Sequence, residues 1–170
     1  MIDHYTLLCK LKTYGLQYTS LKLIENYLTN RIQYCDYKGT RSSNLPVSKG
    51  VPQGSILGPL FFSIYINDIT KSSDKFKFLM YADDTTLHGT LDNFMINNGN
   101  DIDTISTGIN AELKLILAWL DKNRLIINSA KTKMTIFHMP QKIVAYPKIE
   151  INNVHVEIVD DFKFLGITII

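Results

Sequence analysis

One segment constrains the fold of this sequence more than any other: residues 101–122 carry the pattern of a long amphipathic helix. Six aliphatic residues recur there at intervals of three or four and form a single apolar face: Ile102, Ile105, Ile109, Leu113, Ile116 and Leu120. A helix with one apolar face is stable in water only when another layer of secondary structure covers that face. The pattern therefore predicts a helix that packs on a sheet or on other helices.

Short strand-like runs supply a candidate for the covering layer. Residues 76–81 and 85–88 flank Ala82-Asp83-Asp84 and predict a hairpin. Apolar residues alternate again in the tail, at 134–136, 149–151 and 154–158 around a turn at Asn152-Asn153, and a final strand is expected at 162–169. Because helices and hairpins mix without a regular βαβ rhythm, we predict an α+β fold in which the long helix packs on a three- or four-stranded antiparallel sheet.

The first third of the chain predicts two short helices and a hairpin. Leu7, Leu8 and Leu11 have helical spacing that Gly15 would end, and a second helix is expected over 21–28 after a cap at Ser20. Residues 31–38 and 41–48 are strand-like and join at Gly39-Thr40. Because the sequence contains no repeat and no long linker, its 170 residues predict a single domain.

Composition narrows the class of protein only slightly. The net charge is +2, but the first 50 residues hold seven Lys and Arg against three Asp and Glu, which suits phosphate contact and is equally explained by solvated surface charge. The longest apolar run, residues 56–66, is interrupted and too short for a bilayer, and the N-terminus does not resemble a signal peptide. Cys9 and Cys35 favour two reduced thiols in an intracellular protein over a disulfide.

The adjacent carboxylates of Asp83 and Asp84 are the first candidates for chemistry. A hairpin tip can display both side chains without burying unpaired charge. Mg²⁺ takes oxygen ligands and often needs only one or two carboxylates beside substrate phosphates, and two such ions can stabilise both the attacking and the leaving oxygen of phosphoryl transfer. An acidic surface turn without a ligand is the alternative, and such turns are common.

A loop of prolines and glycines, residues 50–60, is the second candidate. Gly54 allows the backbone to approach another molecule closely, and the amide of Gln53 beside it offers hydrogen-bond donors and an acceptor. Pro52 and Pro59 restrict the backbone on either side. The apolar segment that follows would hold the loop from behind, so the stretch indicates a binding loop rather than a simple connection.

In chain order, these residues resemble four motifs of the reverse transcriptases of non-LTR, LINE-type retrotransposons. Residues 48–59, continuing to Ile69, resemble motif B, and Tyr81-Ala82-Asp83-Asp84 resembles motif C, the aromatic-Ala-Asp-Asp box. Residues 125–133 resemble motif D and residues 162–167 resemble motif E. Residues 2–11 resemble the stretch after motif A, so the resemblance covers essentially the whole chain. Ser55 and Leu57-Gly58-Pro59 are similar to the jockey-like elements.

The resemblance implies a polymerase palm and a set of site residues. Asp83 and Asp84 would be catalytic and would bind Mg²⁺, which Mn²⁺ could replace, with Asp83 as the direct ligand. Lys131 would assist the pyrophosphate leaving group, a role for which Lys133 competes. The template and the incoming nucleotide would be bordered by Pro52, Gln53, Gly54, Ser55 and Tyr81, and the primer grip would consist of Phe164, Leu165 and Gly166. The implied partners are an RNA template, a DNA primer and a dNTP.

The resemblance also implies that part of the enzyme lies outside these 170 residues. Motif A of the family contributes another metal-binding aspartate, expected upstream of Asp3, and Asp3 itself matches a later position. We therefore expect a partial palm domain over 1–170, with incomplete fingers and no thumb, that belongs to a longer polyprotein. Its expected parts are residues 1–48 with the post-motif A helices and hairpin, 49–139 with motifs B, C and D, and 140–170 with the motif E hairpin.

The remaining polar and aromatic residues favour ordinary structural roles. The four histidines, His4, His88, His138 and His155, lack the spacing of metal ligands. Trp119 lies on the long helix, and packing in the core is the preferred prediction over stacking on a base. Tyr34 and Tyr37 could stack on nucleic acid in a basic hairpin, but packing within a sheet is the preferred prediction.

The expected function is that of an RNA-directed DNA polymerase domain, a nucleotidyltransferase that works by a two-Mg²⁺ mechanism in the intact enzyme. We expect this chain to be inactive alone. The alternative is a decayed or domesticated palm fragment that acts as a non-catalytic nucleic-acid- or protein-binding module. An RNA-templated RNA polymerase shares the palm but fits the motif B sequence poorly. Target-primed copying would place the protein in the nucleus.

Overall fold

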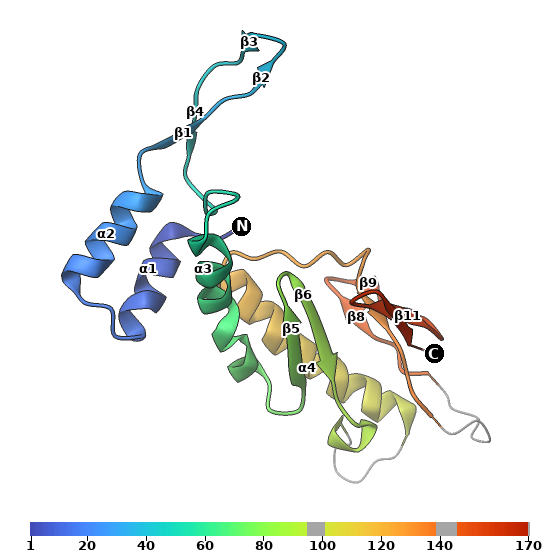
Figure 1. Ribbon diagram of the computed structural model, residues 1–170. Coiled ribbons are helices and arrows are strands. Elements are labelled where there is room, and N and C mark those ends of the chain that lie inside the picture. Colours follow the sequence, from blue (N-terminus) through green and yellow to red (C-terminus); the bar gives the residue numbers. More distant parts are fainter. Residues whose placement is uncertain (95–100, 139–145, 170) are drawn as a thin grey trace.

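The computed structural model describes residues 1–94, 101–138 and 146–169 and confirms an α+β fold (Figure 1). Helices dominate the first two thirds of the chain. The helices of the described residues are α1 (His4–Thr13), α2 (Tyr18–Leu28), α3 (Leu57–Ile66) and α4 (Ile102–Lys122), with two 3₁₀ segments, η1 (Asn67–Ser72) and η2 (Leu91–Phe94). The predicted boundary between residues 139 and 140 lies outside the described residues.

The described strands pair only in twos. The antiparallel pairs are β1 (Arg31–Gln33) with β4 (Leu45–Val47), β2 (Asp36–Tyr37) with β3 (Thr40–Arg41), β5 (Lys77–Tyr81) with β6 (Asp84–His88), β8 (Glu150–Ile151) with β9 (Val154–His155), and β11 (Phe162–Phe164) with β12 (Ile167–Ile169). A parallel pair joins β7 (Lys133–Met134) to β10 (Glu157–Ile158).

The prediction of a three- or four-stranded sheet is therefore wrong for the described residues. The hairpin at 76–88 forms as expected. The tail hairpin forms only over 150–155, since Glu157–Ile158 pair in parallel with β7, and all strands remain in separate two-stranded units. The predicted final strand at 162–169 is instead a hairpin, because Leu165 and Gly166 adopt positive φ angles of 47° and 89° and turn the chain back. Pairing with a near neighbour in sequence closes only a short loop, so it costs less conformational entropy than pairing with a distant strand.

Helix α4 forms as its periodicity predicts and organises the larger core. Asp101 caps the helix by accepting a hydrogen bond from the Thr104 N–H at 3.0 Å. The buried side chains around its apolar face are Ile69, Phe94, Ile105, Ile109, Leu113, Ile116, Ile149 and Ile151, with Phe78 and Met80 of β5 packed against them. Gly108 lets η2 approach closely, because a Cβ at this position would lie 2.3 Å from the Phe94 carbonyl oxygen. The hairpin β5–β6 is thus fixed to the helix by its inward side chains.

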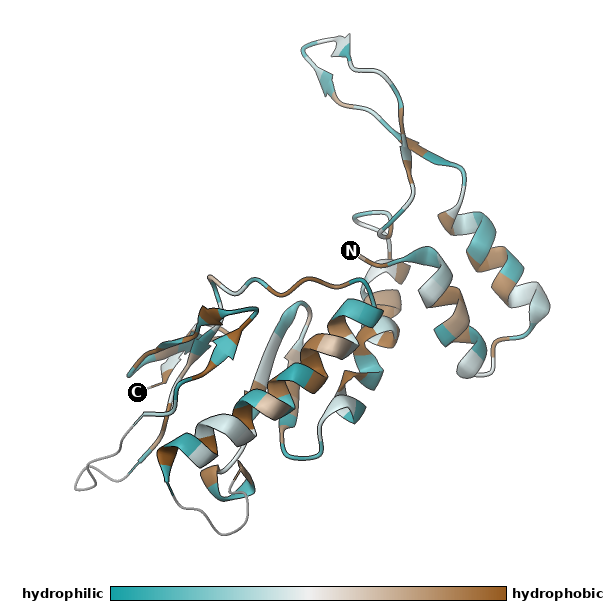
Figure 2. Ribbon diagram, turned by 180° about the vertical axis from the view of Figure 1, so that it is seen from behind, coloured by the Kyte–Doolittle hydropathy of each residue, from teal (hydrophilic) through white to brown (hydrophobic). Residues whose placement is uncertain are grey.

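A second core joins α1, α2 and α3. Its buried members are Ile2, Leu7, Leu11, Leu28, Phe61, Tyr65 and Ile66. Met80 and Trp119 pack against both cores, so the two clusters form one continuous body, and the prediction that Trp119 packs in the core is confirmed. Figure 2 shows the hydrophobic residues gathered along α3 and α4. The predicted cap at Ser20 is wrong, because α2 begins at Tyr18, three residues before the predicted start, after the extended residue Gln17.

The hydroxyl of Tyr65 links three segments that are distant in sequence. The side chain is fully buried, and its hydroxyl donates to the Asn123 carbonyl at 2.6 Å while accepting from the Asp3 N–H at 3.3 Å. Nearby, the Lys10 ammonium donates to the Tyr65 carbonyl and to the Asp68 carboxylate, each at 2.5 Å, and lies 4.7 Å from the centre of the Trp119 ring. The start of α1 and the ends of α3 and α4 are therefore held at one point.

Residues 31–47 form an arm that extends from this body (Figure 1). It consists of β1 and β4 at its base and β2 and β3 at its tip. Every residue from 31 to 46 is exposed. The preferred prediction for Tyr34 and Tyr37, packing within a sheet, is therefore wrong, because the two-stranded arm has no covering layer among the described residues.

None of the helices in the described parts of the chain is long and apolar enough to cross a membrane.

Substitution of Tyr65 by phenylalanine tests the link between the helices. The change removes one hydroxyl and leaves the buried Asn123 carbonyl without its donor, so we expect the free energy of unfolding to fall by about 1–3 kcal/mol. Urea denaturation followed by circular dichroism measures this loss. Tyr81→Phe is the matched control, because the Tyr81 side chain is 62% exposed and should lose almost nothing. Equal stability of the two variants would contradict the role of the Tyr65 hydroxyl.

Candidate functional site

The predicted hairpin around Asp83-Asp84 is confirmed, with a two-residue turn. Tyr81 pairs with Asp84 at the end of the ladder, so Ala82 and Asp83 form the turn and Asp84 begins β6. Along β5 the inward side chains of Phe78 and Met80 are half-buried, whereas the side chains that alternate with them are exposed. This alternation fixes the strand on the core and leaves the tip of the hairpin in solvent.

Both carboxylates at this tip are exposed. They form no ion pair with a described residue. No group of three or more His, Cys, Asp or Glu side chains comes together within the described ranges. Asp83 and Asp84 therefore fit the partial ligand set that Mg²⁺ accepts when substrate phosphates supply further oxygens.

The turn itself holds an alanine in a disfavoured conformation. Ala82 has a φ of 51°, in the left-handed region that glycine tolerates and that costs other L-residues about 1–2 kcal/mol. A glycine is the usual residue at the first position of a two-residue turn in which only that position has positive φ. Local backbone strain of this kind is typical of functional turns. It distinguishes this Asp-Asp pair from Asp160-Asp161, which is equally exposed but lies outside any hairpin turn.

The loop of residues 50–56 is anchored at its start by the N-terminal segment. The Gly50 N–H donates to the Ile2 carbonyl at 2.7 Å, and His4 Nε2 lies 2.6 Å from the Gly50 carbonyl oxygen. Asp3 and Lys49 form an antiparallel bridge beside this contact. Asp3, which is hydrogen-bonded to Tyr65, thus lies between the two residues that hold the loop.

The predicted binding residues of this loop differ in their exposure to solvent and in their contacts. Gln53 and Gly54 are exposed, and Gly54 has a φ of 80° with nothing within 4 Å of an added Cβ, so the backbone conformation rather than crowding requires glycine. Pro52 is half-buried, and its carbonyl accepts from the Ser55 N–H at 3.2 Å. The Ser55 hydroxyl accepts from the Gly58 N–H at 3.0 Å and so caps the start of α3.

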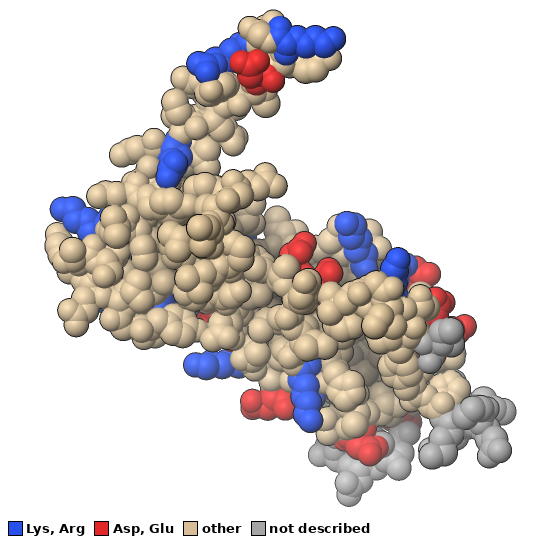
Figure 3. Space-filling model, viewed as in Figure 1, with Lys and Arg blue, Asp and Glu red and all other residues tan. Residues whose placement is uncertain are grey.

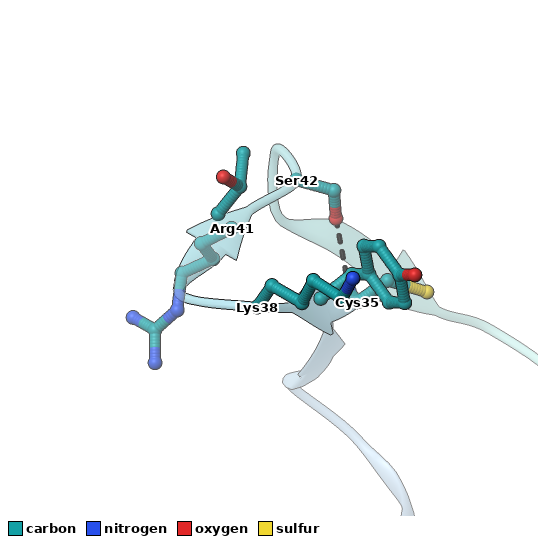
Figure 4. A pocket seen from close by; sticks show the side chains of 6 residues that line it. Cys35, Lys38, Arg41 and Ser42 are labelled. Atoms are coloured by element: carbon teal, nitrogen blue, oxygen red, sulfur yellow. Dashed lines mark hydrogen bonds between the residues drawn. The ribbon is translucent and has the colours of Figure 1, made fainter.

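Packing relates this loop to the hairpin tip indirectly. Val51 and Met80 both pack against the core of α1, α2 and α3, and Met80 lies three residues before Asp83. The tip and the loop therefore share one supporting core. Two surface hollows among the described residues lie elsewhere: one at the tip of the arm (Figure 4), the other between the end of α4 and residues 125–127. The resemblance implies that Gln53 and Asp83 border one cleft, because both would face the same nucleotide; neither hollow tests this expectation.

The two candidate lysines differ in their surroundings. Lys133 forms an ion pair with Glu157 across the β7–β10 ladder. Lys131 is exposed, and within the described residues it has no carboxylate partner. Of the two, Lys131 is therefore the cation available to another molecule.

The predicted primer-grip residues lie at a hairpin tip. Phe164 ends β11, Leu165 is exposed in the turn, and Gly166 completes it. The Phe162 and Phe164 rings lie 6.5 Å apart on the same strand. The tip therefore presents the apolar side chain of Leu165 to solvent.

Asp3 serves the fold and is buried away from solvent. Its carboxylate caps α1 by accepting from the Thr6 N–H at 3.0 Å and pairs with the Arg124 guanidinium at 2.7 Å. Burial raises the pKa of the Asp3 carboxyl, but the hydrogen bonds from Thr6 and the charge of Arg124 together outweigh it and leave the pKa below its ordinary value. Sequence reasoning missed the partners of Asp3 and Tyr65, because the positions of Asn123 and Arg124 just after a helix carry no signal of a distant contact.

Comparisons with known proteins show which family this chain resembles. The sequence profile of the family described as "Reverse transcriptase (RNA-dependent DNA polymerase)" matches residues 1–169. The chain is 25% identical over 154 residues to the "RNA-directed DNA polymerase from mobile element jockey" of Drosophila melanogaster. It is 27% identical over 154 residues to the "Probable RNA-directed DNA polymerase from transposon BS" of the same organism. Each alignment covers 86% of this chain and 16% of the relative, so the chain spans about a sixth of these curated relatives.

The strain at Ala82 predicts an unusual response to glycine. Ala82→Gly removes the penalty of about 1–2 kcal/mol that alanine has in the left-handed conformation, which stabilises the folded state. Glycine also raises the entropy of the unfolded chain, which destabilises the folded state by about 0.4–1 kcal/mol. The free energy of unfolding should therefore stay level or rise. Ala130→Gly is the matched control: Ala130 is exposed in a turn without positive φ, and glycine there should only destabilise. Urea denaturation of both variants measures the free energy of unfolding. A larger decrease for Ala82→Gly than for Ala130→Gly would show that the backbone at Ala82 is not strained.

The lowered pKa of Asp3 predicts a loss of stability in acid. The ionised carboxylate stabilises the folded state above its unfolded pKa, near 3.9, and this contribution disappears as the pH falls through the lower folded pKa. We expect the midpoint of urea unfolding to decrease below about pH 4. Asp3→Asn keeps a capping side chain without the charge and should flatten this part of the profile. An unchanged profile in Asp3→Asn would contradict the assignment.

Proposed function

The chain belongs to the reverse transcriptase (RNA-dependent DNA polymerase) family, and from this membership we propose that it is the palm portion of an RNA-directed DNA polymerase from a jockey-like non-LTR retrotransposon. The observation that carries the proposal is the turn at Ala82-Asp83. It displays two adjacent carboxylates in solvent at the end of a hairpin whose inward residues, Phe78, Met80 and Leu87, pack against the core. The combination of paired strands, a strained turn and two exposed carboxylates favours a polymerase metal site over an ordinary surface turn.

In this proposal Asp83 and Asp84 hold Mg²⁺, or Mn²⁺, with Asp83 as the direct ligand. The bound metal would supply Lewis-acid stabilisation of the charge that develops on the transferred phosphoryl group. The protein's part is to hold both carboxylates in a fixed direction, which the ladder from Tyr81 and Asp84 back to Lys77 and His88 supports. Lys131 would donate a proton to the departing pyrophosphate, since its ammonium has no carboxylate partner among the described residues.

The loop of residues 50–56 would border the template and the incoming dNTP. Gln53 offers its amide to a base or sugar, and Gly54 lets the backbone come close to it because no side chain intervenes. Pro52, Ser55 and the exposed Tyr81 would complete this border. Two features support the assignment: the loop is fixed by Ile2 and His4, and its Val51 shares a supporting core with Met80 of the catalytic hairpin.

The tail would contact the DNA primer. Phe164, Leu165 and Gly166 form the tip of the β11–β12 hairpin, and an exposed apolar tip suits contact with the sugars at a primer end. In this reading residues 1–48 follow motif A, residues 49–139 contain motifs B, C and D, and residues 140–170 form the primer-grip region. Target-primed copying would take place in the nucleus.

A non-catalytic nucleic-acid-binding module is the second candidate function. One observation favours it for these 170 residues by themselves: the described residues bring only two acidic side chains together at the proposed metal site. Two-metal catalysis needs ligands that fix both ions and hold the nucleotide in line. Loss of one metal-binding carboxylate costs on the order of a thousandfold in rate. We therefore propose that this chain, assayed alone, does not extend a primer.

Metal binding tests the proposal directly. Mn²⁺ titration followed by electron paramagnetic resonance, with the chain, an annealed RNA–DNA primer and a dNTP, should show bound Mn²⁺ that Asp83→Asn/Asp84→Asn removes. The Asp160→Asn/Asp161→Asn variant is the matched control, because it removes two adjacent exposed acids with the same change in charge. Equal Mn²⁺ binding by the two double variants would refute the metal site.

Primer extension on the same RNA–DNA substrate separates the two candidate functions. We expect no product from the 170-residue chain with Mg²⁺ or Mn²⁺. Product that Asp83→Ala abolishes would show that these residues alone complete a polymerase site, and would contradict the prediction of inactivity while supporting the polymerase assignment.

A further inference from the structure

We propose that the arm of residues 31–47 is an auxiliary nucleic-acid-binding element that contacts an RNA strand away from the catalytic turn. The arm combines cationic side chains and aromatic faces, exposed from residue 31 to 46, in a part of the chain that the proposed active site does not use. Its own side chains indicate the class of ligand. The proposed function adds only that the nucleic acid at hand is an RNA template, and to that extent the inference rests on it.

The first observation is that no residue of the arm belongs to either hydrophobic core. All residues from 31 to 46 are exposed, with Tyr37 at 72% and Tyr34 at 44%. Figure 1 shows the arm reaching away from the helical body, with β2 and β3 at its far end. An isolated two-stranded hairpin is at best marginally stable in water, so a partner that covers it would stabilise it.

The second observation is the sign of its charge. The arm carries three basic residues, Arg31, Lys38 and Arg41, and a single acid, Asp36. Figure 3 shows Lys and Arg side chains along the arm and at its tip. None of the three basic residues forms an ion pair with a described carboxylate. Although Asp36 lies opposite Arg41 in the β2–β3 ladder, the guanidinium lies instead 3.7 Å from the centre of the Tyr34 ring.

This stacking leaves Arg41 well disposed for phosphate. A guanidinium that rests its face on a ring keeps its N–H donors in the plane, where they can contact a phosphate in bidentate fashion. Figure 4 shows the Arg41 side chain directed away from the backbone of the arm and from Cys35 and Ser42. The tip thus offers a positioned cation instead of a freely moving one.

The turn at the tip presents a second cation. Lys38 and Gly39 have φ angles of 50° and 80° and form a two-residue turn between Tyr37 and Thr40. Asn or Asp is the usual residue at the first position of such a turn, because lysine has no side-chain group that stabilises the left-handed conformation. The Lys38 ammonium lies 5.4 Å from the centre of the Tyr37 ring, so each cation of the tip stands beside an exposed aromatic face. Cations that follow a phosphate backbone and aromatic faces that accept bases are the two components of single-strand binding.

Binding to RNA by the full 170-residue chain tests the proposal. The probe is a labelled, unstructured RNA of about 20 nucleotides, longer than the sites that single-strand-binding folds cover, measured by fluorescence anisotropy over a range of salt concentrations. Lys38→Ala/Arg41→Ala should weaken binding on the order of tenfold and reduce the salt slope by about 1.4, because each released counterion contributes roughly 0.7 on a single strand. Arg41→Lys keeps the charge and removes the planar group, so it should retain most of the slope with weaker binding.

The matched control is Lys71→Ala/Lys114→Ala, which removes two exposed cations outside the arm. We expect it to bind RNA nearly as the unaltered chain does. Thermal unfolding should be the same for all variants, because the substituted side chains are exposed. RNA binding is measured here without Mn²⁺ or dNTP, so a failure of the metal site and a failure of the arm are separate results.

Three outcomes would overturn the proposal. Equal weakening by the arm variant and the control would mean that net charge alone drives binding. Unaltered RNA binding in Lys38→Ala/Arg41→Ala would remove the arm from the interface. A concentration-dependent dimer that the arm variant abolishes, seen by analytical ultracentrifugation without any change in RNA affinity, would assign the arm to contact with a second copy of the chain.

Discussion

The buried hydroxyl of Tyr65 is the interaction on which the rest of the body depends. By accepting from the Asp3 N–H and donating to the Asn123 carbonyl, it holds the start of α1 against the ends of α3 and α4. Arg124 then reaches the Asp3 carboxylate, and Lys10 neutralises Asp68 beside the same ring. A hydroxyl with both partners is stable in an apolar core, whereas the same group without them would be costly to bury. This polar junction therefore also determines which helices can meet.

The candidate site lies outside the polar junction at Tyr65 but is supported by the segments that this junction holds together. Asp83, Asp84, Gln53 and Gly54 are exposed and make few contacts of their own, so their positions depend on the segments behind them. Ile2 and His4 hold the loop at Gly50, and Met80 fixes the hairpin to both cores. A site for a charged substrate needs side chains that are exposed to solvent and yet held in a fixed orientation. A protein meets both requirements by placing these side chains on segments that pack on a rigid core.

The arm and the body are stabilised by different interactions. The body buries aliphatic residues and pairs its buried charges, whereas the arm buries nothing and leaves its cations without carboxylate partners among the described residues. Its local order comes from a turn at Lys38-Gly39, a short ladder and guanidinium–aromatic stacking. Such an element gains most of its stability from a partner. A ligand bound at the arm would therefore leave the core behind the Ala82-Asp83 turn unaltered.

The sequence alone determined the features that depend on residues close together in the chain. The period of Ile102 to Leu120 predicted α4, and the strand-like runs around Ala82-Asp83 predicted the hairpin, because helix periodicity and two-residue turns are local properties. Four ordered motifs identified the family. Only the tertiary structure decided how the strands associate, that Tyr34 and Tyr37 lie in solvent, and that Tyr65, Asp3 and Asn123 meet. These outcomes depend on which distant segments come into contact, and a β-pattern or a buried tyrosine in the sequence does not specify its partner.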